Sequence, residues 1–143
     1  MKLDHVALYV KDLEGSKAFF MKYFDAVPNE KYHNPRTGLM TYFLTFADSG
    51  GARLEIMTRP EMADPVRHPF ALGWAHLSIK VGSPERVRAL TDRLRSDGFE
   101  IVSEPRTTGD GYYESCFLDK EGNQIELVAL LVQKAAFIVA ISS

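Results

Sequence analysis

The feature that most constrains the fold of this 143-residue chain is that its two halves repeat each other at an offset of 71 positions. Residues 4–10 (DHVALYV) align with 75–81 (AHLSIKV), and 46–57 (FADSGGARLEIM) align with 117–128 (FLDKEGNQIELV), without a gap. Such self-similarity is typical of a duplicated supersecondary unit. We therefore expect two modules, at residues 1–70 and 71–132, followed by an apolar tail at 133–143.

The periodicity of each half predicts the same order of elements. Segment 4–10 alternates apolar and polar residues, which is typical of a half-buried strand. Helices are expected at 13–24 and 84–96, the second with Ser83 as its cap, Pro84 in its first turn and Gly98 after its end. Ala18, Phe19, Met21 and Phe24 are expected on the inward side of the first helix. Further strands are expected at 25–32 (weakly), 40–47, 53–57, 75–81, 99–103, 112–118 and 124–131.

This order predicts an α+β fold in which two βαβββ modules form one curved, mixed sheet of about eight strands. A single module would leave one face of its sheet with too little cover to be stable alone. Two modules together could bury both helices, so both modules are expected to form one domain.

The strand period also places four residues of metal-binding types, two His and two Glu, on the less apolar face of their strands. In each of four strands the apolar residues share one face, and His5, Glu55, His76 or Glu126 lies on the other. His5 maps onto His76 and Glu55 onto Glu126 by the same 71 positions. A pseudo-twofold arrangement of the modules would bring the four side chains to one point.

Two imidazoles and two carboxylates suit a divalent metal and leave positions open for water or substrate. Zn, Ni and Co are the first choices, with Mn and Fe(II) as the second. A single His in a strand is usually a structural residue, but matching faces and flanks in both halves favour a metal site. His33 and His68 lack matching repeat partners and are interpreted as surface or loop residues.

The segments LDHVALYVKDLEGSKAFF, RLEIM, GWAHLSIKV and FLDKEGNQIELV, between residue 3 and about 128, together resemble the glyoxalase I branch of the vicinal-oxygen-chelate superfamily. The resemblance implies a cup of βαβββ modules around a metal, in a homodimer. It implies a lyase that isomerises the hemithioacetal of a thiol and a 2-oxoaldehyde. Glu126 is then the first candidate for the catalytic base and Glu55 the second.

The resemblance also indicates where the substrate binds. Glutathione-using members carry Arg four residues after the first His and Asn four residues after the first Glu. This chain has Tyr9 and Arg59 there, so these two residues are predicted to bind substrate, and a thiol other than glutathione is an alternative. Loops at 29–39, 58–72 and 104–111 are expected to set specificity.

Other functions of the same family stay open. Dioxygenases and thiol transferases of this family typically use two His and one Glu, and epimerases typically have Gln in place of Glu55. A non-catalytic resistance-type protein that sequesters a small molecule is a further alternative.

The composition argues against several partners. A formal net charge of −2 and the lack of a basic tract give no reason to expect nucleic acid. The single cysteine, Cys116, excludes an internal disulfide and favours a reducing, cytoplasmic location. The opening residues lack the apolar region of a signal peptide, and the apolar tail is too short and interrupted for a membrane span. The expected partner is a small-molecule substrate.

Overall fold

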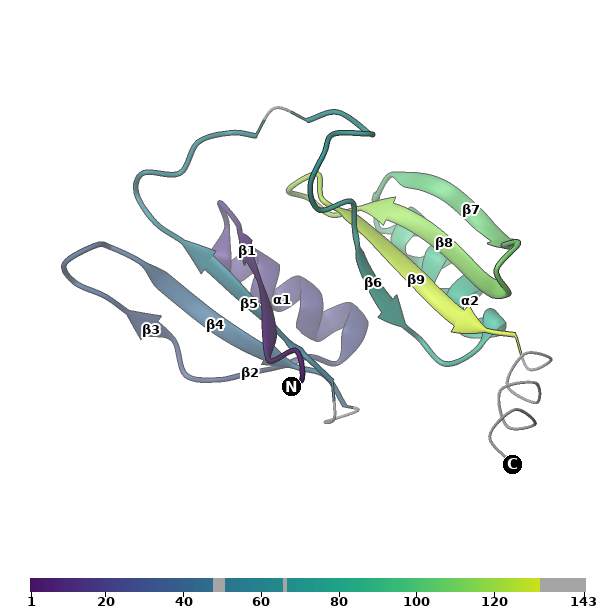
Figure 1. The fold of residues 1–143 in the computed structure, drawn as a ribbon, viewed down its shortest axis with the longest axis horizontal. Helices are drawn as coiled ribbons and strands as arrows, with labels where there is room; N and C mark the ends of the chain where they lie inside the picture. Colours follow the sequence, from purple (N-terminus) through teal and green to yellow (C-terminus); the bar gives the residue numbers. More distant parts are fainter. Residues whose placement is uncertain (48–50, 66, 132–143) are drawn as a thin grey trace. The chain divides into compact units, whose positions relative to one another are not determined.

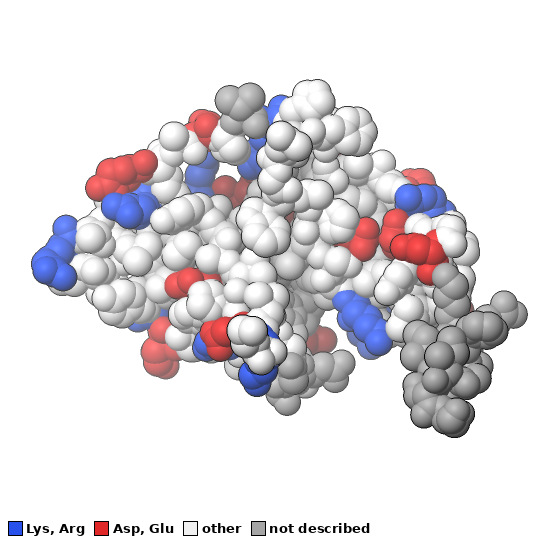
Figure 2. Space-filling view, in the orientation of Figure 1, with Lys and Arg blue, Asp and Glu red and all other residues white. Residues whose placement is uncertain are grey.

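The computed structural model describes residues 1–47, 51–65 and 67–131, and it divides the chain into two units, Met1–Val66 and Arg67–Ser143 (Figure 1). The apolar tail expected at 133–143 lies outside the described residues. Neither helix in the described ranges has the length and apolarity to cross a bilayer. Acidic and basic side chains are interspersed on the visible face, with no large patch of basic charge (Figure 2).

The first unit is a mixed sheet with one helix on one of its faces (Figure 1). The strand order is β1-β5-β4-β2, with β3 also paired to β4; β1 runs parallel to β5, and the other pairs are antiparallel. The elements are β1 (His5–Tyr9), α1 (Leu13–Phe24), β2 (Val27–Pro28), β3 (Tyr32–His33), β4 (Met40–Thr45) and β5 (Arg53–Thr58). Two very short strands, β2 and β3, thus stand in place of the weak strand expected at 25–32.

The second unit repeats this plan. Its strand order is β6-β9-β8-β7, with β6 parallel to β9 and the other pairs antiparallel. The elements are β6 (Leu77–Lys80), α2 (Pro84–Ser96), β7 (Ile101–Thr107), β8 (Tyr112–Leu118) and β9 (Gln124–Leu130).

The predicted α+β class and both helices are confirmed, but the strands do not form one sheet. Over the residues that the structure describes, each unit has its own sheet, of five strands in the first and four in the second. The physical reason is the crossover through the helix: each first strand pairs in parallel with the last strand of its own unit. Each sheet is therefore built from strands of one unit only.

Helix α1 packs on the sheet through a different stripe from the one predicted. Its buried residues are Leu13, Phe20 and Tyr23, whereas Ala18 and Met21 are exposed. The prediction was wrong for Ala18 and Met21, whereas Phe19 and Phe24 are half-buried. Apolar residues occur around much of this short helix, so the sequence does not single out one stripe. Burying Phe20 completely contributes on the order of 1.5–3 kcal/mol.

The last hairpins of the two units differ in register by two residues. Glu55 lies opposite Phe43, so the repeat would place residue 114 opposite Glu126; the structure places Cys116 there instead. A shift of two residues keeps every side chain on its original face. The sequence-equivalent Tyr42 and Tyr113 therefore both face their helices but occupy different positions along the sheet.

The sequence D-x-x-G at residues 119–122 forms the turn between β8 and β9, and its Asp and its Gly each have a structural role. One carboxylate oxygen of Asp119 accepts hydrogen bonds from the backbone N–H groups of Glu121 (2.9 Å) and Asn123 (2.8 Å). Gly122 adopts a φ of 77°, a conformation that favours glycine. Burial raises the pKa of Asp119, so these hydrogen bonds offset a real desolvation cost.

Replacement of Asp119 by Ala is expected to lower the free energy of unfolding by about 1–3 kcal/mol, because two backbone N–H groups lose their acceptor. Asp119→Asn keeps an oxygen for those groups and should lose less. Urea unfolding of both variants measures the difference. Equal stability of Asp119→Ala and the wild type would contradict this account of the turn.

Candidate metal-binding pairs

The first unit brings His5 and Glu55 together on the sheet face opposite α1. His5 opens β1, and Glu55 lies in the middle of β5, with Ala7 as its cross-strand neighbour. The Nε2 atom of His5 lies 3.6 Å from Oε2 of Glu55. The side chain of His5 is 38% exposed and that of Glu55 is 15% exposed, so the pair is accessible from this face.

The second unit forms the corresponding pair from His76 and Glu126. His76 directly precedes β6, and Glu126 lies in β9 opposite Ser78. His76 Nε2 lies 3.5 Å from Glu126 Oε2, and the two side chains are 40% and 15% exposed. The repeat at 71 positions therefore extends from the sequence to the geometry of the two pairs.

The spacing within each pair suits two ligands of one metal ion. Two ligand atoms that each lie about 2.1 Å from zinc at a tetrahedral angle are about 3.4 Å apart. The observed distances of 3.6 and 3.5 Å are close to that value. Imidazole nitrogen and carboxylate oxygen also match what Zn and neighbouring divalent metals accept. The residues present therefore fit a metal.

His5 has a second partner that orients its ring. Its Nδ1 lies 2.7 Å from Oδ2 of Asp4, which leaves Nε2 for the side of Glu55. The pKa of Asp4 is lowered, first by the hydrogen bond to His5 and then by the one to Arg53. A carboxylate on the far nitrogen is the usual support for a metal-binding His. Phe43 packs its ring edge-on to the imidazole, with the ring centroids 5.2 Å apart.

The neighbours of Glu126 are different because of the register shift. Cys116 lies opposite Glu126 on β8, and Glu114 is the next residue of the same face. Burial, followed by the charge of Glu126, raises the pKa of both Cys116 and Glu114. Arg106 lies 3.4 Å from Glu114 and balances part of this negative charge.

The two predicted substrate-binding residues lie close together at one end of the first sheet. Tyr9 ends β1 and is 53% exposed, and Arg59 directly follows β5. Hydrogen bonds to Glu61 and, secondarily, to Tyr9 raise the pKa of Arg59. An exposed phenol and a cation stand side by side there, on the strands that carry His5 and Glu55.

Within either unit, over the described ranges, no group of three or more His, Cys, Asp and Glu side chains suited to a metal is found. The structure brings His5 to Glu55 and His76 to Glu126. The convergence of both pairs on one ion stays a prediction.

Sequence reasoning missed three residues that form hydrogen bonds with these pairs, which are Asp4, Thr41 and Ser78. Asp4 could have been found as the neighbour of His5. Thr41 and Ser78 could not have been found from the repeat, because their counterparts at 71 positions are Tyr112 and Ala7. Only the pairing of strands shows that their hydroxyl groups reach the carboxylates.

Comparison with known proteins places the chain in a family. The model of the Glyoxalase/Bleomycin resistance protein/Dioxygenase superfamily matches residues 2–127, which is most of the chain. The chain belongs to this superfamily. The vicinal-oxygen-chelate membership that the sequence predicts is thereby confirmed.

Several individual proteins resemble the chain over nearly its whole length. The uncharacterized protein YqjT of Bacillus subtilis is 24% identical over 134 residues, which cover 89% of this chain and 98% of that protein. A glyoxalase family protein from Enterococcus faecalis has a TM-score of 0.70 at 27% identity, covering 90% of this chain and 97% of that one. The fosfomycin resistance protein FosX from Listeria monocytogenes, solved with Mn(II) and sulfate, has a TM-score of 0.68 at 23% identity, covering 94% and 96%.

Addition of Zn²⁺, Ni²⁺ or Co²⁺ is expected to raise the melting temperature by several degrees, since a ligand at 100 times its Kd stabilises by about 2.7 kcal/mol. His5→Ala and His76→Ala should each lose most of this shift, which thermal unfolding measures. His33→Ala, in the exposed strand β3, is the matched control and should keep it. An unchanged shift in both His5→Ala and His76→Ala would contradict the assignment of the pairs.

Proposed function

We propose that this chain is a metal-dependent lyase of the glyoxalase I type, acting on the hemithioacetal of a thiol and a 2-oxoaldehyde. The observation that carries the proposal is the duplicated His–Glu pair, with ligand-like spacing of 3.6 and 3.5 Å on equivalent strands. Membership of a superfamily that includes glyoxalases supports it. The Mn(II) bound by FosX, a protein of similar fold, supports a divalent metal in this fold.

In this proposal His5, Glu55, His76 and Glu126 hold one divalent metal. When bound, the metal would withdraw electron density from the two vicinal oxygens of the substrate and make the neighbouring C–H bond more acidic. Four protein ligands leave one or two positions for those oxygens. Fosfomycin thiol transferases and dioxygenases of the family typically provide three ligands, so the second Glu favours the glyoxalase type.

The chain's own residues would then move the proton. Glu126 takes the proton from the carbon that carries the sulfur and returns it to the adjacent carbon, while the hydroxyl proton passes from the oxygen on the first carbon to the oxygen on the second. Atoms and charge then balance without a further reactant. The side chain of Glu126 is 15% exposed, which limits competition from water while leaving one side open to a substrate. Glu55 shares this level of exposure and is the second candidate for the base.

Tyr9 and Arg59 are proposed to bind the thiol part of the substrate. The phenol of Tyr9 and the guanidinium of Arg59, at one end of the first sheet, can form hydrogen bonds with a carboxylate or amide group that the thiol carries. Their identities differ from the Arg and Asn typical of glutathione-using members, so the proposal includes thiols other than glutathione.

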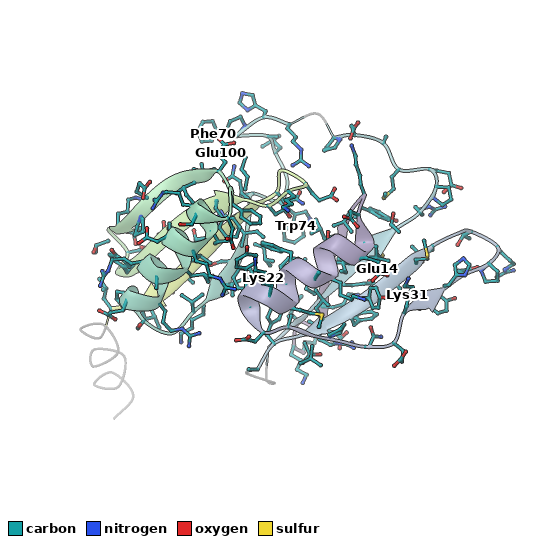
Figure 3. All side chains as sticks on the ribbon, turned by 180° about the vertical axis from the view of Figure 1, so that it is seen from behind. Glu14, Lys22, Lys31, Phe70, Trp74 and Glu100 are labelled. Carbon is teal, nitrogen blue, oxygen red and sulfur yellow. The ribbon has the colours of Figure 1, made fainter. Side chains whose placement is uncertain are left out.

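Glu126→Gln is expected to lower kcat at least 100-fold, which is about the lower end of what a general base contributes. The assay is the conversion of methylglyoxal with glutathione and other low-molecular-weight thiols by metal-loaded protein, with metal content measured in parallel. Glu100→Gln is the control: Glu100 is exposed and lies between α2 and β7 (Figure 3). Wild-type turnover by metal-loaded Glu126→Gln would refute the assignment of the base.

Arg59→Ala is expected to raise KM about tenfold with little change in kcat, because a charged hydrogen bond made equally in the ground and transition states is lost. Steady-state kinetics with the best thiol separates the two constants. Arg86→Ala, an exposed cation at the start of α2, is the control. A fall in kcat with unchanged KM would contradict a role in binding alone.

A second candidate function is a non-catalytic protein that sequesters a small molecule. The exposed Tyr9 and the pairing of Arg59 with Glu61 favour it, because neither matches the family's thiol-binding pattern. Metal-loaded protein that binds a ligand but turns over no thiol–aldehyde adduct would favour this second function.

A further inference from the structure

Each candidate carboxylate receives a hydrogen bond from a neighbouring hydroxyl group. Thr41 Oγ1 donates to Glu55 Oε1 at 3.0 Å, and Ser78 Oγ donates to Glu126 Oε1 at 2.7 Å. In both cases the other oxygen, Oε2, is the one that lies 3.6 or 3.5 Å from the His. The hydroxyl group thus binds Oε1 of each carboxylate, and Oε2 stays directed at the Nε2 atom of the paired His.

The two hydroxyl groups come from different strands. Thr41 lies on β4, an antiparallel neighbour of β5, whereas Ser78 lies on β6, the parallel neighbour of β9. Their counterparts in the repeat, Tyr112 and Ala7, have no aliphatic hydroxyl. The same contact is therefore made twice by unrelated positions, which argues that it does more than reflect the duplication.

Burial makes the two contacts unequal. Thr41 is 5% exposed, so water cannot readily replace its hydroxyl at Glu55. Ser78 is exposed, so a water molecule can take the place of its hydroxyl at Glu126. A hydrogen bond shielded from water holds its acceptor in one orientation more firmly than an exposed one.

We propose that Thr41 and Ser78 are positioning residues for the two carboxylates and that their roles differ. Thr41 fixes Glu55 in a single orientation as a permanent metal ligand. Ser78 aligns Glu126 less firmly, because water can replace its hydroxyl group, and so leaves this carboxylate free to move, as a carboxylate that also transfers a proton must. Fixing a carboxylate in advance lowers the entropy lost on metal binding. This inference rests on the proposed function for the identity of the metal ligands.

The test is the Co²⁺ dissociation constant of the full chain, measured by competition with a chromophoric chelator. Thr41→Val replaces the hydroxyl by a methyl group of similar size and should weaken Co²⁺ binding about tenfold to 100-fold, the usual range for such supporting residues. Thr41→Ser restores the hydroxyl and should restore the affinity. Ser78→Ala should weaken binding less than about threefold, because water substitutes. Urea unfolding of the metal-free variants checks that the fold is kept.

The outcomes separate this inference from the proposed function. If the wild type binds no Co²⁺, or if His5→Ala and His76→Ala each bind Co²⁺ as tightly as the wild type does, both proposals are overturned. If binding depends on the His residues but Thr41→Val binds like the wild type, the positioning role alone is overturned. Failure of Thr41→Ser to restore binding, or a loss in Ser78→Ala as large as in Thr41→Val, also overturns it.

Discussion

The parallel pairing of the first and last strands within each unit is the constraint on which the candidate site depends. Residues 5 and 55, or 76 and 126, are far apart along the chain, and only this pairing makes them neighbours. Parallel strands need a crossover connection, and α1 and α2 provide it. Each helix thereby covers one face of its sheet and leaves the opposite face for polar chemistry.

The same pairing keeps the carboxylates on the correct face. Ile56 and Leu127 are fully buried under the helices, and each directly follows the Glu of its strand. A slip of one residue in β5 or β9 would expose these side chains and bury a carboxylate in an apolar layer. The hydrophobic core and the position of the candidate His–Glu pairs are consequently one constraint, because neither can move without the other.

Duplication sets the two pairs but leaves their surroundings free to diverge. The two-residue shift in the last hairpin places Phe43 beside Glu55 and Cys116 beside Glu126. Such a shift costs little, because it preserves the face of every side chain. Glu55 is consequently set beside an aromatic ring and a buried hydroxyl, whereas Glu126 lies near a thiol, a second carboxylate and an exposed hydroxyl. Residues that are identical in the two halves therefore have different surroundings, which permits them to have different roles.

The sequence by itself determined the two helices, the main strands, the outward face of His5, Glu55, His76 and Glu126, and the family. These follow from local periodicity and from the repeat, which are readable along the chain. Tertiary structure decided that the strands form two sheets, which stripe of α1 is buried, and that Thr41 and Ser78 reach the carboxylates. Those features depend on strand register and on packing between residues distant in sequence, and no local pattern specifies either.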